Sequence, residues 1–449
     1  MSIAKLLIIV SYFSPCFSEV ILHSPKVSSL SADIEFYPDE LKGVLVDENR
    51  DVSFGIIWEN GAKYVDVQIS VVSENPDILK IENATLMDER IREGLKNYTF
   101  TVRGVFLGYT SVTVKIADEH QSKEWHLKVS VVRQYNILVD IVTGLMAALV
   151  AFNYINMGVQ LDMNVIGKVL KRPYGPTIGF FCQFLFMPLA SYGISLLLLE
   201  DKSLQLGLFT LGCSPGGSMS NFWTLLFDGD VNLSVTMTFI STIAALAMMP
   251  LWIFTLGASL FRDRQATIPF VNLAGSLIIL TLPIGIGLLI QQYSPRLSKI
   301  SDRIIKPVTI VCVLFGISVG LYANSFVFYL FTWQVMLAGL SIAWGGYCFG
   351  AVVAWLFKLD KAQIIAVSIE TAFQNPAVAF VMLVLSLPQP EADLSSVPVI
   401  AQLMLTGLPM WALLVATRIY RKFCKRTEKT DKKVYTVVEM NGAEDQCNM

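Results

Sequence analysis

The chain contains few of the residues that most enzymes and metal sites require. Only three histidines occur in 449 residues, and all lie before residue 136, so the apolar part of the chain has none for a proton relay or a haem. The seven cysteines show no metal-ligand spacing, and no glycine-rich loop followed by Lys-Ser or Lys-Thr is present to bind a nucleotide. No nucleophile, base and acid form a recognisable motif, so the sequence predicts neither an enzyme nor an organic cofactor nor a nucleic-acid partner.

Charged residues are scarce as well. They make up 16% of the chain against 54% hydrophobic residues, and the mean hydropathy is +0.56. These values exclude an average soluble domain. The charges gather in residues 19–135 and 421–449, while the block between them is almost continuously apolar. This distribution predicts a polar amino-terminal region, a membrane domain and a short polar tail.

The amino terminus resembles a cleaved signal peptide over residues 1–18. Lys5 precedes a short apolar run that ends in small residues, and this run is too short to span a bilayer. The alternative is an uncleaved anchor. Asn83 and Asn97 each begin a glycosylation sequon, which matters only in a secreted compartment and therefore agrees with the signal peptide.

Residues 19–133 are predicted to form an extracellular β-rich domain. Apolar and polar residues alternate there in runs separated by Asn, Gly and Asp, the pattern of half-buried antiparallel strands. No cysteine lies between Glu19 and Asp140, so no disulfide is expected. About 110 residues of this kind suit a β-sandwich-like fold. The apolar members of the runs are Val65, Val67, Ile69 and Val71; Tyr98, Phe100 and Val102; Val112, Val114 and Ile116; and Trp125, Leu127, Val129 and Val131.

Residues 136–420 are predicted to form a multi-spanning α-helical membrane domain of about nine helices embedded in a lipid bilayer. An odd number of spans places the two ends of the block on opposite sides. With the amino end outside, the inner loops hold 14 basic residues and the outer loops hold three. This favours a cytosolic tail at 421–449. The plasma membrane is the default address, and an internal membrane is the alternative. The predicted spans are 136–159, 174–198, 203–227, 231–257, 268–291, 304–325, 330–357, 362–386 and 396–419.

Two of these spans contain polar interruptions. In the third, Pro215 lacks an N–H and two glycines follow it, so the helix should unwind there. In the eighth, Glu370 begins the run Glu-Thr-Ala-Phe-Gln-Asn-Pro. Broken helices at membrane depth occur where the chain is buried in protein or lines a cavity, as in the ion sites of transporters. The alternative for the Pro-Gly-Gly run is helix packing alone.

Glu370 is the candidate carboxylate of a cation site. Its span contains no Lys or Arg beyond Lys361 at the inner end, and a charge at membrane depth needs a partner. Unwound carbonyls, together with Ser218, Ser220 and Asn221, supply neutral oxygens that suit Na⁺. The missing counter-charge is therefore predicted to be a transported cation. The alternative is a protonated Glu370 that acts as a structural hydrogen-bond donor.

Five motifs of the apolar block occur together. They are Cys213-Ser-Pro-Gly-Gly-Ser-Met-Ser-Asn221, Asp228-Gly-Asp-Val-Asn-Leu-Ser234, Ala247-Met-Met-Pro250, Cys182-Gln-Phe-Leu-Phe-Met-Pro188 and Glu370 with Gln374-Asn375. In combination they resemble the bile acid:sodium symporter family over residues 136–420. The amino-terminal β-rich region is similar to the less characterised, amino-extended branch of that family.

The resemblance implies a panel domain and a core domain, with two discontinuous helices that cross beside two sodium sites. Ser234 and Thr238 are four residues apart, so both hydroxyls lie on one face of their helix. Asn375, with Pro215 and Gly216, would lie toward the substrate. One sodium would bind Ser220, Asn221, Ser234, Thr238 and Glu370, and the other would bind Gln183, Glu370, Gln374 and the carbonyls around Thr371 and Phe373.

These expectations combine in one function. The chain is predicted to be a sodium-coupled symporter that moves an amphipathic organic anion, such as a bile acid or a steroid sulfate, by alternating access. The alternative is a receptor or adhesion protein that works through its extracellular β-domain and does not transport.

Overall fold

The computed structural model describes residues 19–24, 32–58, 67–86, 95–117, 122–134, 137–160, 163–171, 173–217, 219–261, 270–294, 296–297, 322, 325–417 and 419. The predicted signal peptide, nearly all of the predicted span 304–325 and the predicted tail lie outside these residues. The chain divides into two compact units, one made of Met1–Ile137 with Pro388–Asp393 and the other of Leu138–Leu387 with Leu394–Met449.

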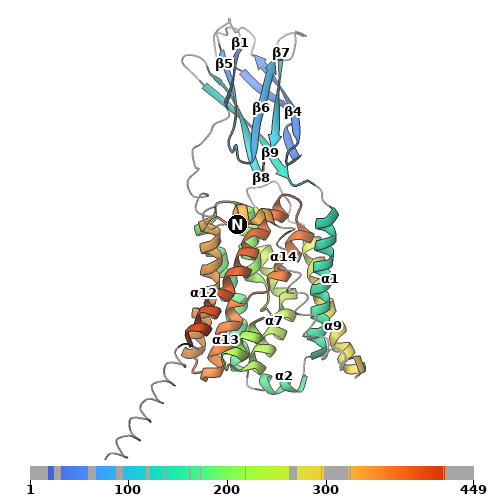
Figure 1. Ribbon diagram of the computed structural model, residues 1–449, viewed down its shortest axis with the longest axis vertical. Coiled ribbons are helices and arrows are strands. Elements are labelled where there is room, and N and C mark those ends of the chain that lie inside the picture. The colour runs from blue at the N-terminus through green and yellow to red at the C-terminus, as the bar shows by residue number, and fades with distance from the viewer. Residues whose placement is uncertain are drawn as a thin grey trace, which may run out of the picture. The chain divides into compact units, whose positions relative to one another are not determined.

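The first unit contains two β-sheets that face each other (Figure 1). All strand pairs are antiparallel except β3 with β9, which is parallel. The first sheet has the order β1 (Glu19–Ser24), β5 (Val67–Ser73), β8 (Gly108–Ala117), β9 (Ser122–Val132) and β3 (Glu40–Leu45). The second has the order β2 (Ala32–Tyr37), β4 (Asn49–Trp58), β7 (Leu95–Gly104) and β6 (Leu79–Leu86).

The alternating residues of both sheets point into one shared core. Phe54 of β4 lies opposite Tyr98 of β7, and their rings stack with centroids 5.2 Å apart. Both side chains are fully buried, together with Val114 of β8 and Val131 of β9 from the other sheet. The period-two pattern predicted at β7, β8 and β9 is confirmed, and that at β5 is confirmed for Ile69 and Val71, while Val65 and the Val67 side chain lie outside the described residues. Burial of this core holds the sheets together.

A partly buried ion pair joins two distant segments of this unit. Arg133, just after β9, donates to both carboxylate oxygens of Asp393, and its Nη2 lies 2.6 Å from Asp393 Oδ1. The bidentate geometry makes the contact both strong and directional. The segment Pro388–Asp393 therefore belongs to the same compact unit as the strands, although 260 residues separate the two partners.

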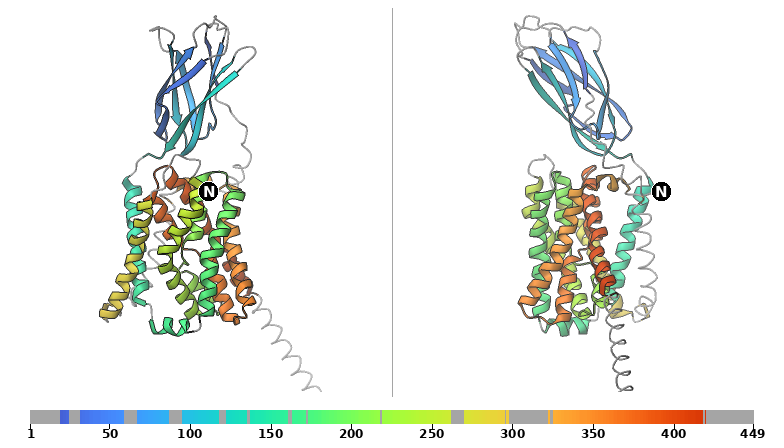
Figure 2. Two further views of the ribbon diagram at one scale, coloured as in Figure 1. Left: turned by 180° about the vertical axis from the view of Figure 1, so that it is seen from behind. Right: turned by 60° about the vertical axis from the view of Figure 1, so that its left-hand side comes forward.

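The second unit is a bundle of helices that run side by side (Figure 2). Four described helices are long and apolar enough to cross a membrane: Tyr174–Leu198, Val231–Leu260, Trp333–Leu356 and Glu391–Thr417. The labelled elements are α1 (Ile137–Gln160), α2 (Met163–Leu170), α3 (Tyr174–Phe181), η3 (Cys182–Phe186), α4 (Met187–Leu198), α5 (Lys202–Cys213), α6 (Met219–Leu226), α7 (Val231–Trp252), η4 (Ile253–Gly257), α8 (Ala258–Phe261), α9 (Phe270–Tyr293), η6 (Ser325–Leu330), α12 (Trp333–Leu356), α13 (Lys361–Ala372) and α14 (Pro376–Ser386).

The four long helices coincide with predicted spans, and α1 and α9 occupy two more. The predicted spans 203–227 and 362–386 are each split into two helices, α5 with α6 and α13 with α14. The total of nine spans stays a prediction. Trp333 and Trp355 lie near the two ends of α12 and are 69% and 67% exposed, about 33 Å apart at 1.5 Å per residue. That separation matches the thickness of a bilayer's hydrocarbon core.

Proline shapes one of these helices in a way that the sequence analysis did not predict. Pro188 has no N–H, so the carbonyl of Phe184 loses its partner within the helix. Trp252 Nε1 of α7 donates to this carbonyl at 2.7 Å. The preceding turn widens into the π-helical segment η3, and such turns often occur at functional sites. The widened turn carries Gln183.

Candidate functional site

The two helix breaks cross and pair with each other. The backbone N–H of Gly217 donates to Phe373 O at 2.7 Å, and the N–H of Asn375 donates to Pro215 O at 2.9 Å. Gly216 and Gln374 lie opposite each other between these bonds, as in a short antiparallel ribbon. Unwinding leaves backbone groups without helical partners, and here each break satisfies the other.

Glycine is needed where the two breaks touch. A Cβ on Gly217 would lie 2.6 Å from the carbonyl oxygen of Gln374. A Cβ on Gly216 would lie 2.2 Å from Oε1 of Glu370. Both distances are far below van der Waals contact. The Pro-Gly-Gly run therefore has a geometric role at the crossing beyond ordinary helix packing.

Glu370 lies at the centre of a buried group of oxygens, and its side chain is only 2% exposed. Its Oε2 accepts hydrogen bonds from Ser220 Oγ at 2.6 Å and from Ser234 Oγ at 3.0 Å. Its Oε1 accepts from Thr238 Oγ1 at 2.6 Å. The hydroxyls come from α6 and α7, so the carboxylate of α13 ties three helices together. Within the described part of the chain, no Lys or Arg forms an ion pair with Glu370.

This group, which we call the Glu370 cluster (Ser220, Asn221, Ser234, Thr238 and Glu370), has more side-chain oxygen lone pairs than hydroxyl hydrogens. Each hydroxyl carries one hydrogen, yet each lies within hydrogen-bond distance of a second acceptor besides Glu370. Those second acceptors are Gly217 O, 2.8 Å from Ser220 Oγ; Asn221 Oδ1, 2.8 Å from Ser234 Oγ; and Ser234 O, 3.0 Å from Thr238 Oγ1. Gly217 O also accepts from Ser220 N at 3.0 Å and Ser234 O lies within α7, so Asn221 Oδ1 and the carboxylate compete for the hydroxyl hydrogens. Surplus oxygen lone pairs around a buried carboxylate are the chemistry that a hard cation requires.

A second polar group surrounds Gln183 on the widened turn η3. Its Nε2 donates to Ser214 O and to Gln374 Oε1, both at 2.7 Å. Gln374 Nε2 in turn donates to Thr371 O at 2.8 Å. Oε1 of Gln183 is buried and has no hydrogen-bond partner among the described residues. An orphaned acceptor of this kind also fits a cation.

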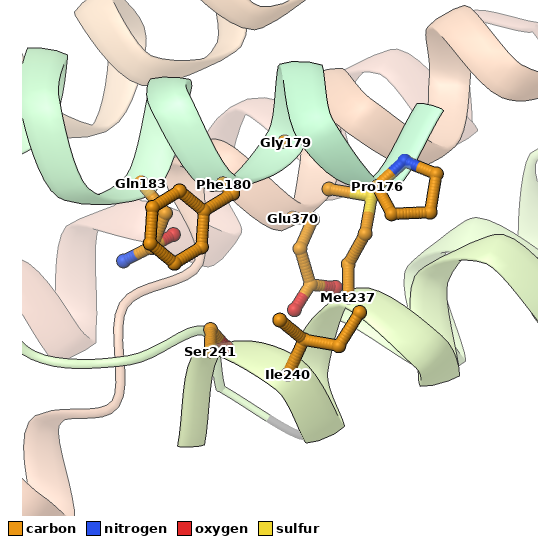
Figure 3. Close-up of a pocket in the computed structure, with 8 residues that line it drawn as sticks. All are labelled: Pro176, Gly179, Phe180, Gln183, Met237, Ile240, Ser241 and Glu370. Carbon is orange, nitrogen blue, oxygen red and sulfur yellow. The ribbon is translucent and has the colours of Figure 1, made fainter. Parts of the chain in front are cut away.

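A small pocket lies beside both groups (Figure 3). The Glu370 side chain lies between two helical segments, with Gln183 on one and Ser241 on the other. The space open to a water-sized sphere is about 10 Å³, which is about what one water or one small cation occupies. The complete lining is Pro176, Gly179, Phe180, Gln183, Met237, Ile240, Ser241 and Glu370.

The other described candidate residues named in the sequence analysis lie at the crossing, beside Glu370 or on strands of the β-unit. Phe373 O is already bonded to Gly217, and Thr371 contributes its carbonyl as described above. Gly216 lies against Glu370, so its surroundings are those of the Glu370 cluster. Asn83 is exposed on β6; Asn97 lies on β7, but its side chain lies outside the described part. Glycosylation at both stays a prediction.

The sequence analysis missed three residues of the site. Ser241 accepts from Gly216 N at 3.1 Å, and it lies seven residues after Ser234, so helical periodicity could have found it. Ser214 bonds Asn375 N through its hydroxyl at 3.2 Å. Tyr154 accepts from Asn375 Nδ2 at 2.5 Å, and no local signal in α1 identifies it.

The broken helices, their crossing and the buried oxygen-rich group define a polytopic membrane protein of the transporter class. Residues 146–330 match the Sodium Bile acid symporter family. This match confirms the resemblance to that family which the motifs predicted.

Three relatives extend the comparison. P3 protein of Bos taurus is 28% identical over 406 residues, which cover 86% of this chain and 83% of the relative. P3 protein of Homo sapiens is 32% identical over 62% of this chain and 58% of its own length. Sodium-dependent organic anion transporter of Bos taurus is 30% identical over 56% of this chain and 66% of its own length. A match over 86% of the chain cannot fit within residues 137–449 alone, so the bovine P3 similarity includes part of the amino-terminal region.

Proposed function

We propose that this protein is a sodium-coupled symporter of an amphipathic organic anion. The Glu370 cluster would bind one sodium, and Gln183, Gln374, Glu370 and the carbonyls of Thr371 and Phe373 would bind another. Sodium is therefore cargo and coupling ion, and no resident metal is needed. The family match and the relative named as an organic anion transporter support this class of substrate, which includes bile acids and steroid sulfates.

The single observation that carries the proposal is the shortage of protons around Glu370. Three hydroxyl hydrogens serve the Glu370 carboxylate and Asn221 Oδ1, while the other two acceptors, Gly217 O and Ser234 O, also have backbone donors. A sodium ion would use the remaining lone pairs of the carboxylate and neutralise the buried charge. A protonated Glu370 is the alternative, and the variant described below, which resembles that neutral form, distinguishes the two.

The crossing links the sodium positions to a substrate position. The half-helices α6 and α14 both begin there, and helix amino termini carry partial positive charge that favours an anion. Asn375 follows Gln374 directly, so an anion at Asn375 and a sodium at Gln374 would both favour one conformation of the same backbone segment. Such coupling must be reciprocal, with each ligand raising the affinity for the other. Movement of the panel domain against the core would then expose the site to either side in turn.

The remaining architecture is proposed from the sequence pattern. Nine spans, an outside amino terminus after a cleaved signal peptide and a cytosolic tail place the β-domain, residues 19–133, outside the cell, with the plasma membrane as the address. The similarity to bovine P3 protein in the amino-terminal region supports placement in the amino-extended branch. A receptor that does not transport is not favoured, because an anchor would not require a complete oxygen cluster.

The test is Glu370→Gln, which keeps the shape of the side chain and removes its charge. A cation about 4 Å from a unit charge gains roughly 4 kcal/mol at an effective dielectric constant of about 20, which is about a thousandfold in affinity. We expect the variant to reach the cell surface but to lose sodium-dependent uptake of labelled taurocholate and oestrone sulfate and to lose ²²Na⁺ binding. Glu200→Gln, at an exposed carboxylate, is the matched control. Sodium binding that survives in Glu370→Gln refutes the proposal.

A further inference from the structure

Besides the helical bond that its carbonyl accepts from Ala379 N, Asn375 makes four hydrogen bonds to different parts of the helical unit. Its backbone N–H is shared between Pro215 O and Ser214 Oγ at the crossing. Its Oδ1 accepts from Val378 N and so caps α14. Its Nδ2 donates to the hydroxyl of Tyr154 on α1 at 2.5 Å. We call this last bond the Tyr154 tether. It is the only one of the four that leads away from the two broken helices.

Both ends of the Tyr154 tether are shielded from solvent. The Tyr154 side chain is 6% exposed and the Asn375 side chain is 8% exposed. A buried amide hydrogen that loses its partner carries a desolvation penalty, so the tether must be replaced when it breaks. A phenol oxygen is a neutral acceptor, whereas a carboxylate, sulfonate or sulfate oxygen forms a charge-assisted bond about twice as strong.

Tyr154 is positioned by close packing between α1 and α9. Gly158 lies one turn after Tyr154, on the same face of α1. A Cβ on Gly158 would lie 2.4 Å from Ile284 O, and a Cβ on Gly287 would lie 2.2 Å from Ile155 O. The backbones of α1 and α9 therefore touch at these glycines. Moving the crossing away from this pair of helices requires the Tyr154 tether to break.

We propose that the Tyr154 tether couples sodium movement to the organic anion. Without the anion, Tyr154 holds Asn375 and restrains the crossing against α1. An anionic oxygen replaces the phenol as the acceptor of Asn375 Nδ2 and so releases α1. Sodium bound alone leaves the tether intact, which limits uncoupled sodium leak. Tyr154 is thus a positioning residue, and this inference rests on the proposed function.

The test is Tyr154→Phe in the full-length chain, reconstituted in phosphatidylcholine liposomes. The substitution keeps the ring and removes only the acceptor. With no organic anion present, we expect ²²Na⁺ influx to rise about two- to tenfold over the wild type, the effect of one hydrogen bond on the rate. Equilibrium ²²Na⁺ affinity should stay within about twofold. A merely structural role would lower both quantities together.

Matched variants separate the possible results. Tyr347→Phe removes another phenol near the crossing, one that donates to Thr406 O at 3.0 Å, and should leave the influx at the wild-type level. Combining Tyr154→Phe with Glu370→Gln should return the influx to background, because the ions must pass through the Glu370 cluster. Unchanged or reduced influx in Tyr154→Phe overturns the inference, as does influx that persists in the double variant. If the wild type binds no more ²²Na⁺ than Glu370→Gln does, the proposed function itself fails.

Discussion

Gly216→Ala tests the geometry of the Glu370 cluster without changing any ligand. The φ angle of Gly216 lies outside the left-handed region, so alanine adds a contact and no backbone strain. The new methyl carbon would lie 2.2 Å from Glu370 Oε1 and 3.4 Å from Ser241 Oγ. Carbon and oxygen normally approach no closer than about 3.3 Å, so the carboxylate must retreat by about 1 Å.

The retreat sets the expected loss of sodium affinity. The bond from Thr238 Oγ1 to Glu370 Oε1 is 2.6 Å long, and a shift of about 1 Å takes it beyond hydrogen-bond range. Hydrogen bonds to charged groups contribute about 1.5 to 3 kcal/mol. One displaced oxygen should therefore weaken sodium binding about 10- to 100-fold.

The assay is a sodium titration of thermal stability in detergent, repeated as ²²Na⁺ binding. Bound sodium stabilises only the folded protein, so the midpoint of the titration follows its affinity. Gly193→Ala on α4 is the matched control, because its Cβ would enter open space. A sodium midpoint within twofold of the wild type in Gly216→Ala would show that the carboxylate position does not determine ion binding.

Two further predictions concern stability. Gly287→Ala should lower the thermal midpoint of unfolding by the equivalent of about 1 to 3 kcal/mol, because its Cβ meets the Ile155 carbonyl, which belongs to the backbone and cannot rotate away. Gly285→Ala on the same helix, where the Cβ has open space, should leave the midpoint unchanged. Equal midpoints for the two variants would contradict the close packing. In the β-domain, the Trp125 indole N–H donates to Asp33 Oδ1 at 2.9 Å and lowers the pKa of that carboxyl from 3.8. A lowered folded-state pKa stabilises the fold above the unfolded value, and this stability is lost as the pH falls through the folded value. Trp125→Phe should therefore unfold at a lower temperature than the wild type at neutral pH, and this difference in unfolding temperature should disappear below about pH 4. A difference that persists at low pH would show that the substitution acts through packing.

Local chemistry made the crossing predictable from the sequence. Pro215 and the glycines after it cannot continue a helix, and Glu370 cannot lie in lipid without a partner. The spacing of Ser234 and Thr238 places both hydroxyls on one helix face. Each of these inferences depends on residues close in the chain, and the structure brings all of them to one buried cluster.

Contacts between distant segments could not be predicted in the same way. Tyr154 meets Asn375 across 221 residues, and nothing in the composition of α1 distinguishes it from other apolar spans. The wide turn η3 depends on Trp252, which satisfies the carbonyl that Pro188 leaves without a partner. Strand β4, Asn49–Trp58, carries alternating Val52, Phe54 and Ile56 but was not among the predicted runs. Its pattern was present and was missed.

The ion pair between Arg133 and Asp393 has a consequence for biosynthesis. The strands emerge from the ribosome first, but the compact unit that contains them also includes Pro388–Asp393. Asp393 is made 260 residues after Arg133, which at about 5 to 20 residues per second is a delay of about 15 to 50 seconds. During that interval every intervening helix is synthesised before the carboxylate partner of Arg133 exists. This ion pair can therefore form only after nearly the whole chain has been made, and a product truncated before Asp393 would lack it.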